Sequence, residues 1–263
     1  MSSVVPFLLE LVLKMTMTAA VVVAASVVAE RSGPFIGAMV AALPTAAGAA
    51  YVILAIEHPP SFIAGGAIGS VAANSAVVIF SFAYAVLAQR RGVIASLGGA
   101  LLVWLACAAL LRTVDWTVPG VLLLSAVVFG ILIPAGARYR TATNIKVRTQ
   151  TADIAWRALA VAVCVVVVTA ASHSIGSFAS GIFALFPVVI SSVLVIIQLR
   201  LGGPAAASVA AHVPEPLIGL SLGFLAVHYL AEPAGVWWAF AAGLAVCFAW
   251  SGMLWLIRQH RAA

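Results

Sequence analysis

The sequence predicts an all-α polytopic membrane protein, and three observations support this class. Of the 263 residues, 65% are hydrophobic and only 8% are charged, whereas a water-soluble domain carries roughly a quarter of its residues as charged side chains. Apolar runs of about 20 residues, the length of a membrane-spanning helix, recur along the whole chain. The alternation of polar and apolar residues that marks the strands of a membrane barrel is missing from the sequence.

Polar interruptions divide the chain into about nine transmembrane helices within a single integral membrane domain, residues 1–263. The loop 138–152 is the one long connection, and the sequence offers no soluble domain. The expected spans, in chain order, are 6–29, 34–56, 61–88, 93–111, 117–136, 153–172, 177–199, 205–231 and 234–257.

The basic residues predict the orientation of the chain. With nine spans, all of the 13 lysines and arginines except Lys14 and Arg112 fall toward one side of the membrane, and the cytoplasmic side is the one rich in these residues. We therefore expect the N-terminus outside, the C-terminus in the cytoplasm, and location in the cell (cytoplasmic) membrane. The net charge of +6 is explained by these topology signals, so no nucleic-acid partner is expected.

A shift of 143 residues superposes the chain on itself without gaps. Residues 33–53 (GPFIGAMVAALPTAAGAAYVI) fall on residues 176–196 (GSFASGIFALFPVVISSVLVI), and Pro44 falls on Pro187. The same shift superposes the first four spans on the last four. It also places the acid–base pair Glu10/Lys14 on the pair Asp153/Arg157. Because charged residues are rare in this chain, the second coincidence strengthens the first.

The parity of the spans makes these repeats inverted. Repeat one covers 1–111, a connector helix follows at 112–137 with the cytoplasmic loop 138–152, and repeat two covers 153–263. Four spans, one connector and four spans place the second repeat upside down relative to the first. Inverted repeats are typical of secondary transporters, whose solute sites lie near the midplane where interrupted helices of the two halves meet.

Prolines predict where such interruptions lie. Pro44 and Pro187 stand about halfway along spans two and seven, and a proline there removes one helical hydrogen bond and frees carbonyl groups. A packing kink is the better explanation of a single proline, and the pairing of Pro44 with Pro187 under the shift brings the two interpretations level. Thr45 and Ser191, which follow the two prolines, would supply hydroxyl groups for a solute, although membrane helices also use such groups to bond their neighbours.

Span three contributes small residues and one amide. Its glycines together with Ser70 form a smooth face suited to close helix packing. Asn74 lies at the centre of the span, where its amide must find a partner. The sequence leaves open whether that partner is a neighbouring helix or a solute.

Span eight carries the polar stretch AAHVPEPLIGL, residues 210–220. Counted from the start of the span, Glu215 lies roughly 15 Å deep, near the centre of the bilayer. Pro214 and Pro216 lack amide donors, so we expect the helix to open beside this acid. An acid at that depth suits proton or Na⁺ coupling, and His212 would contact the solute or relay a proton. The alternative is a neutral Glu215 tied to a neighbouring helix.

The two acid–base pairs allow two interpretations. Glu10/Lys14 and Asp153/Arg157 have the favourable i, i+4 order of a helical ion pair. They are candidate gates that open in alternation, or anchors that reach the two interfaces. The remaining histidines, His58, His173, His228 and His260, lie near span ends and mark interfaces.

These patterns favour a secondary transporter that moves a small solute by alternating access of the two repeats. An organic anion and a neutral solute are both compatible with the sequence, as are proton and sodium coupling. The alternative is a non-transporting membrane scaffold or assembly partner. We do not expect an enzyme, because catalytic motifs are missing. No cofactor or metal is expected, since a multivalent metal carrier would need several carboxylates. Assembly into homo-oligomers stays open.

Overall fold

The computed structural model describes residues 45–140 and 151–262, together with Thr16. Within these residues the regular elements are all helices and there is no strand, as expected of a helical membrane protein. The expected span 6–29 apart from Thr16, residues 34–44 of the expected span 34–56, and the residues Glu10, Lys14 and Pro44 lie outside them. The helices are α3 (Thr45–Glu57), α4 (Pro60–Ala88), α5 (Val93–Leu111), α6 (Val118–Ala137), α7 (Thr151–Ala184), α8 (Val188–Leu201), α9 (Gly203–His212), α10 (Pro214–Leu230) and α11 (Val236–Ala262).

Six segments of the described chain are long and apolar enough to cross a membrane. The shorter apolar helix Ala46–Glu57 comes before them. Large apolar side chains point outward from several of these segments, for example Leu102, Leu123 and Val167, as lipid-facing residues do. The six segments are Pro60–Ala88, Val93–Leu111, Val118–Ala137, Ala152–Leu201, Gly203–Leu230 and Val236–Ile257.

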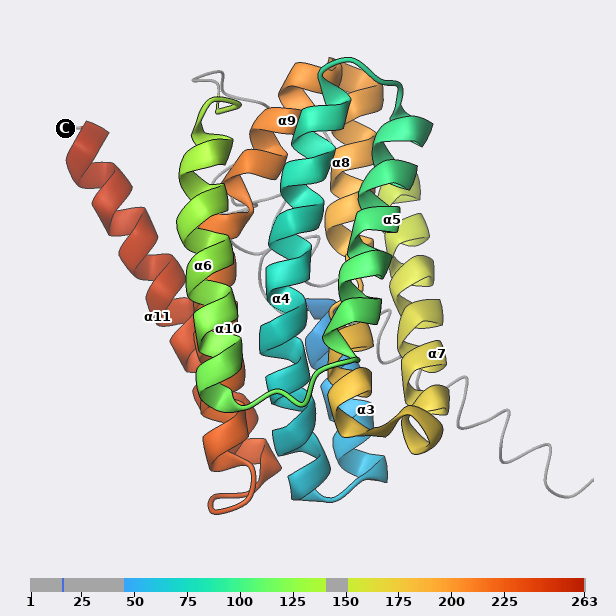
Figure 1. Cartoon of the computed structure of the whole chain (residues 1–263), viewed down its shortest axis with the longest axis vertical. Coiled ribbons are helices and arrows are strands. Elements are labelled where there is room, and N and C mark those ends of the chain that lie inside the picture. Colours follow the sequence, from blue (N-terminus) through green and yellow to red (C-terminus); the bar gives the residue numbers. More distant parts are fainter. Residues whose placement is uncertain (1–15, 17–44, 141–150, 263) are drawn as a thin grey trace, which may run out of the picture.

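Helix α4 forms the centre of the bundle. Helices α5, α6, α7, α9 and α10 all pack against it (Figure 1). Small residues fill most of its length, and large side chains such as Phe80 and Tyr84 are fully buried near its end. The glycines and alanines of α4 allow its neighbours to approach closely, which replaces the hydrophobic driving force that is missing between helices in lipid.

Helices α9 and α10 form one rod that runs antiparallel to α4. The start of the rod touches the end of α4, since a Cβ added to Gly203 would lie 1.8 Å from the Ala88 carbonyl oxygen. The far end of the rod reaches the start of α4, where His228 Nδ1 lies 2.9 Å from the Ala64 carbonyl oxygen. Val213, between α9 and α10, keeps right-handed helical dihedrals (φ −58°, ψ −40°). The expected opening beside Glu215 is therefore limited to lost amide donors, and the rod stays continuous.

The segment Ala152–Leu201 contains two genuine interruptions. Gly176 adopts φ 80° and ψ 172°, a region that favours glycine, and the chain reverses there. Residues 177–184 then run back alongside α4. The helix stops again at Leu185–Pro187 before α8 begins at Val188. Pro187 thus lies where the helix of the expected span 177–199 is interrupted.

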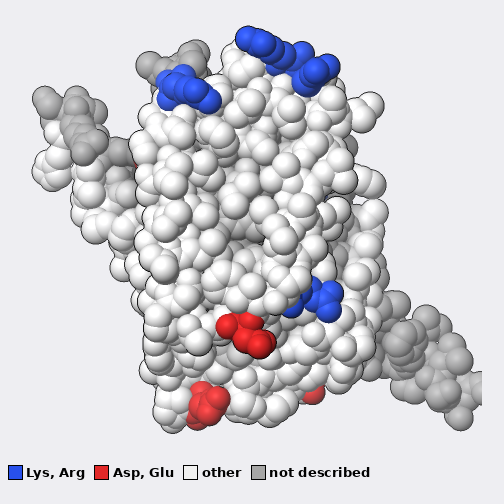
Figure 2. All heavy atoms as spheres, viewed as in Figure 1, with Lys and Arg blue, Asp and Glu red and all other residues white. Residues whose placement is uncertain are grey.

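The two ends of the bundle differ in charge. The end that holds the α4–α5 link is called the basic end, and the opposite one the acidic end. In Figure 2, Lys and Arg side chains gather at the basic end. Asp and Glu side chains lie near the acidic end, with one basic group beside them. The basic end carries Arg90, Arg91, Arg138, Arg140 and Arg200, and the acidic end carries Glu57, Asp115 and Glu232 together with Arg112.

Candidate functional site

Asn74 lies at the midpoint of α4 and is fully buried. Its side-chain nitrogen donates to the Leu217 carbonyl oxygen at 2.7 Å and to Ser221 Oγ at 2.8 Å, both on α10. Its side-chain oxygen Oδ1 is buried and has no hydrogen-bond partner among the described residues. A buried acceptor without a hydrogen bond costs about 1–3 kcal/mol. A further hydrogen-bond donor beside Asn74 Oδ1 would therefore be stabilising.

Ser70 lies one turn before Asn74 and ties three elements together. Its hydroxyl donates to the Gly181 carbonyl oxygen at 2.9 Å and shares a 2.8 Å hydrogen bond with Tyr51 of α3. The Tyr51 ring in turn packs against Phe224 of α10, with ring centroids 5.2 Å apart. This network is satisfied, so Ser70 holds α3, α4 and the segment 177–184 in place.

The interruption at Leu185–Pro187 lies level with Asn74 along α4. Ser177 lies against Gly65, and Gly181 accepts the bond from Ser70. Residues 177–184 and the facing part of α4 therefore run in the same direction, and both rise by about one turn between these two contacts. One more helical turn along each of them brings Asn74 level with Leu185. The unpartnered amide oxygen and the interrupted helix thus occupy the same height in the bundle.

Two more buried polar atoms without a hydrogen-bond partner among the described residues flank this interruption. One is Trp104 Nε1 on α5, whose ring packs edge-on against Phe186 with centroids 5.1 Å apart. The other is Ser191 Oγ, in the first turn of α8. Ser191 was expected near a solute from the sequence, whereas Trp104 was not. Thr45 begins α3, and its side chain lies outside the description.

Glu215 is paired with Arg140, which lies three residues beyond the end of α6. The guanidinium donates to the carboxylate through Nη1, and to the Ala211 carbonyl oxygen through Nε at 3.2 Å and Nη2 at 3.1 Å. Trp250 of α11 donates to the Glu215 carbonyl oxygen at 2.9 Å. Arg140 was interpreted from the sequence only as a topology signal, because its pairing across helices leaves no mark in the local pattern.

The depth of Glu215 follows from its position in the rod. Glu215 stands two residues, about 3 Å, before Leu217, the mid-bundle partner of Asn74. Gly136, one residue before the end of α6, lies against Ala211, one turn before Glu215. Glu215 therefore lies near the middle of the rod, just beyond the level at which α6 ends.

His212 and the prolines do not join Asn74. The His212 ring lies 2.7 Å from the carbonyl oxygen of Ser208, one turn back in its own helix. Pro214 and Pro216 fall in the first turn of α10. Their missing N–H groups would have served the carbonyls of Ala210 and His212, and Arg140 donates to the carbonyl between these two, that of Ala211.

The expected gate residues of repeat two bind α8. Asp153 pairs with Arg200 at 2.7 Å, and Arg157 Nε donates to Ser192 Oγ at 3.0 Å. Arg157 is buried and Asp153 lies at the basic end. These contacts hold the start of α7 against α8. Their counterparts Glu10 and Lys14 lie outside the described residues.

No family model, curated protein or solved structure matches this chain. The argument for function therefore depends on the geometry above.

Proposed function

We propose that this protein is a secondary transporter that moves a small solute by alternating access of two inverted repeats. The observation that carries the proposal is the buried, unpartnered Asn74 Oδ1 at mid-bundle, level with the helix interruption at Leu185–Pro187. Interrupted helices meeting at the midplane are the usual solute site of such proteins.

The helix boundaries support the repeat. A shift of 143 residues carries the first residues of α4 and α5 onto those of α9 and α11, namely Pro60 to Gly203 and Val93 to Val236. Boundaries depend on turns and caps rather than on general hydrophobicity, so their agreement is independent of the apolar identities in the sequence.

The packing of α4 on the rod supports the inversion. The two are antiparallel, and Asn74 bonds to Leu217, its equivalent under the shift. The contact between Ala88 and Gly203 joins the last residue of α4 to the first residue of its counterpart. A two-fold axis lying across the bundle between Asn74 and Leu217 would generate this arrangement.

In this proposal the solute binds where Asn74, Ser191 and Trp104 leave polar atoms unpartnered. These groups offer an amide oxygen, a hydroxyl and an indole N–H, a set that suits a polar neutral solute or a small organic anion. Glu215 remains the candidate coupling group. Its protonation would weaken the pairing with Arg140 and release α6 from the α9–α10 rod.

We further propose that the basic end faces the cytoplasm, following the excess of arginine there. The C-terminus of α11 would then be cytoplasmic and the acidic end would face outward. The scaffold alternative differs in one respect: it requires no solute flux.

Flux in proteoliposomes tests the proposal. Purified protein is reconstituted and challenged with a panel of labelled organic anions and neutral solutes, with and without a pH gradient. We expect saturable uptake of at least one solute, a loss of at least tenfold in Asn74→Ala, and near-normal uptake in the neighbouring control Ser75→Ala. Uptake no greater than in protein-free liposomes throughout the panel would favour the scaffold.

A second variant tests coupling alone. Glu215→Gln should keep solute counterflow, which needs no gradient, and lose the stimulation by a pH gradient. Full gradient-driven flux in Glu215→Gln would contradict the coupling role while leaving transport intact.

A further inference from the structure

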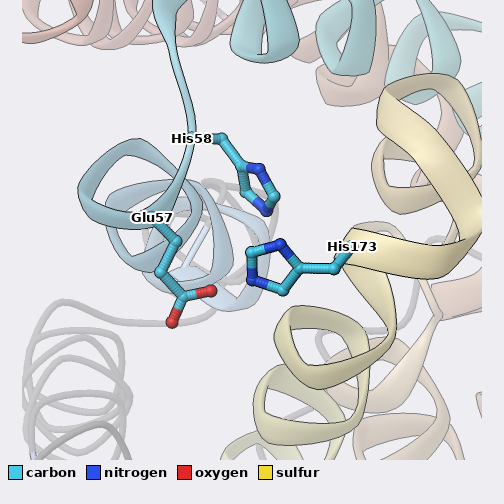
Figure 3. Close-up of side chains that lie close together, drawn as sticks. All are labelled: Glu57, His58 and His173. Atoms are coloured by element: carbon cyan, nitrogen blue, oxygen red, sulfur yellow. The ribbon is translucent and has the colours of Figure 1, made fainter.

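A second group of chemically active side chains lies at the acidic end, away from Asn74. Glu57 ends α3, His58 follows it in the link to α4, and His173 comes from α7 just before the reversal at Gly176. Each offers a ligand atom, and the three atoms lie within 4.8 Å of one another. In Figure 3 the Glu57 carboxylate and the His58 ring both point toward the ring of His173.

We propose that Glu57, His58 and His173 form a binding site for a divalent transition-metal ion, specifically Zn²⁺. Two imidazoles and one carboxylate form a ligand set that suits Zn²⁺. Ca²⁺ and Mg²⁺ prefer sites made of oxygen ligands. The site is independent of the proposed transport function, and it differs from the sequence expectation, which included no metal.

The site would have to close around its ion. In a tetrahedral Zn²⁺ site two ligand atoms are about 3.3–3.6 Å apart, because each metal–ligand bond is about 2.0–2.2 Å long. Rotation of the exposed His173 side chain can shorten the present separations by the required amount. Three protein ligands leave a fourth position for water.

The surroundings of His58 hold its ring in place for this role. The ring stacks on Phe62 with centroids 3.8 Å apart and planes 7° from parallel. Its Nε2 lies 2.7 Å from Ser172 Oγ, whose hydroxyl donates to the Thr169 carbonyl oxygen. The stacking on Phe62 and the contact with Ser172 together fix the orientation of the ring.

The site joins parts of the chain that are distant in sequence. Glu57 and His58 belong to the α3–α4 link, whereas His173 belongs to the end of the first stretch of α7. A bound ion would therefore cross-link these two segments at the acidic end. Folding, rather than local sequence spacing, brings the ligands together.

Metal binding to the full-length protein tests the site. The protein is purified in detergent through a tag without histidine, treated with EDTA, and titrated with Zn²⁺ by calorimetry and with Co²⁺ by visible absorption. We expect one ion per chain and a tetrahedral Co²⁺ spectrum. The affinity should fall at least tenfold in His58→Ala and in His173→Ala, and less in Glu57→Gln. Millimolar Mg²⁺ or Ca²⁺ should not compete.

Two further variants guard against misfolding and unrelated histidines. His173→Cys restores a ligand and should recover binding, while His260→Ala removes an exposed histidine elsewhere and should change nothing. The proposal is overturned if the wild type takes up no more Zn²⁺ than a His58→Ala/His173→Ala double variant. It is also overturned if His260→Ala weakens binding as much as His173→Ala, since the histidines would then bind without a defined site.

Discussion

Asn74 donates a hydrogen bond of 2.7 Å to the backbone carbonyl of Leu217, which lies 143 residues later in the chain. The same separation superposes the sequence on itself. A residue that touches its own repeat equivalent must lie on or near the symmetry axis of the proposed inverted repeat. This contact therefore connects the sequence pattern, the antiparallel packing of α4 on the rod, and the unpartnered amide oxygen at mid-bundle.

The first prediction concerns the stability that this contact contributes. Asn74→Ala removes two interhelical hydrogen bonds and should lower the free energy of unfolding in detergent by about 1–2 kcal/mol, since such bonds average about 0.6 kcal/mol and reach about 1.7. Ser221→Ala keeps the bond to Leu217 and should cost less. The double variant should cost less than the sum of the singles. Additive costs would contradict a direct contact between Asn74 and Ser221.

The second prediction concerns the pairing of Arg140 with Glu215. Arg140→Ala leaves the acid without this partner and also removes the donors to Ala211, so unfolding should become easier by roughly 2 kcal/mol, between the values for exposed and buried pairs. Thermal unfolding in detergent measures this. Glu215→Gln should cost less, because its amide oxygen still accepts from Arg140.

The matched control for this pair is Arg138→Ala, which removes an arginine from the same end of α6 without breaking the contact to the rod. It should leave the midpoint of unfolding almost unchanged. Equal losses in Arg138→Ala and Arg140→Ala would mean that the general charge of the basic end stabilises the protein and that the specific pair does not.

The helices themselves were accessible from the sequence, for a physical reason. A helix in lipid must satisfy its own backbone and present apolar side chains, so hydropathy locates it directly. The expected span 93–111 coincides with α5, and 117–136 differs from α6 by one residue at each end. The interruption at Pro187 was also accessible, since a proline constrains its own backbone wherever it stands.

Contacts between helices were not accessible, because they depend on rotation and height within the bundle. Nothing near Glu215 in the sequence indicates Arg140, and nothing near His58 indicates His173. Asn74 was identified as a residue in need of partners, but its partners required the packing of α10.

The third prediction concerns the close approach of α4 and the segment 177–184. A Cβ added to Gly69 would lie 2.0 Å from the Phe178 carbonyl oxygen, so Gly69→Ala must separate the two backbones. We expect a loss of about 1–3 kcal/mol and a lower midpoint of thermal unfolding. Gly130→Ala is the matched control, because nothing lies within 4 Å of its added Cβ. It should be neutral or slightly stabilising.

The fourth prediction isolates backbone conformation from crowding. Gly176 has φ 80°, and a Cβ added there meets nothing within 4 Å. Any cost of Gly176→Ala must therefore come from the backbone conformation itself (φ 80°, ψ 172°), which is essentially restricted to glycine and costs other residues about 1–3 kcal/mol. Gly176→Asn should cost about as much, because asparagine tolerates positive φ mainly where ψ is about +45°. Equal stability of all three proteins would mean that the reversal before residue 177 does not need the positive φ.

The fifth prediction concerns the two ends of the bundle. Asp115 and Glu232 are exposed at the acidic end, and Arg91 is exposed at the basic end. In a background with Cys107, Cys164 and Cys247 replaced by alanine, single cysteines at these three positions are treated with a membrane-impermeant maleimide. We expect Asp115→Cys and Glu232→Cys to react in intact cells, and Arg91→Cys to react only after the membrane is opened. The reverse pattern would contradict the proposed orientation but keep the fold. Labelling of all three from one side would contradict the fold itself, because α5 would then fail to cross the membrane between Arg91 and Asp115.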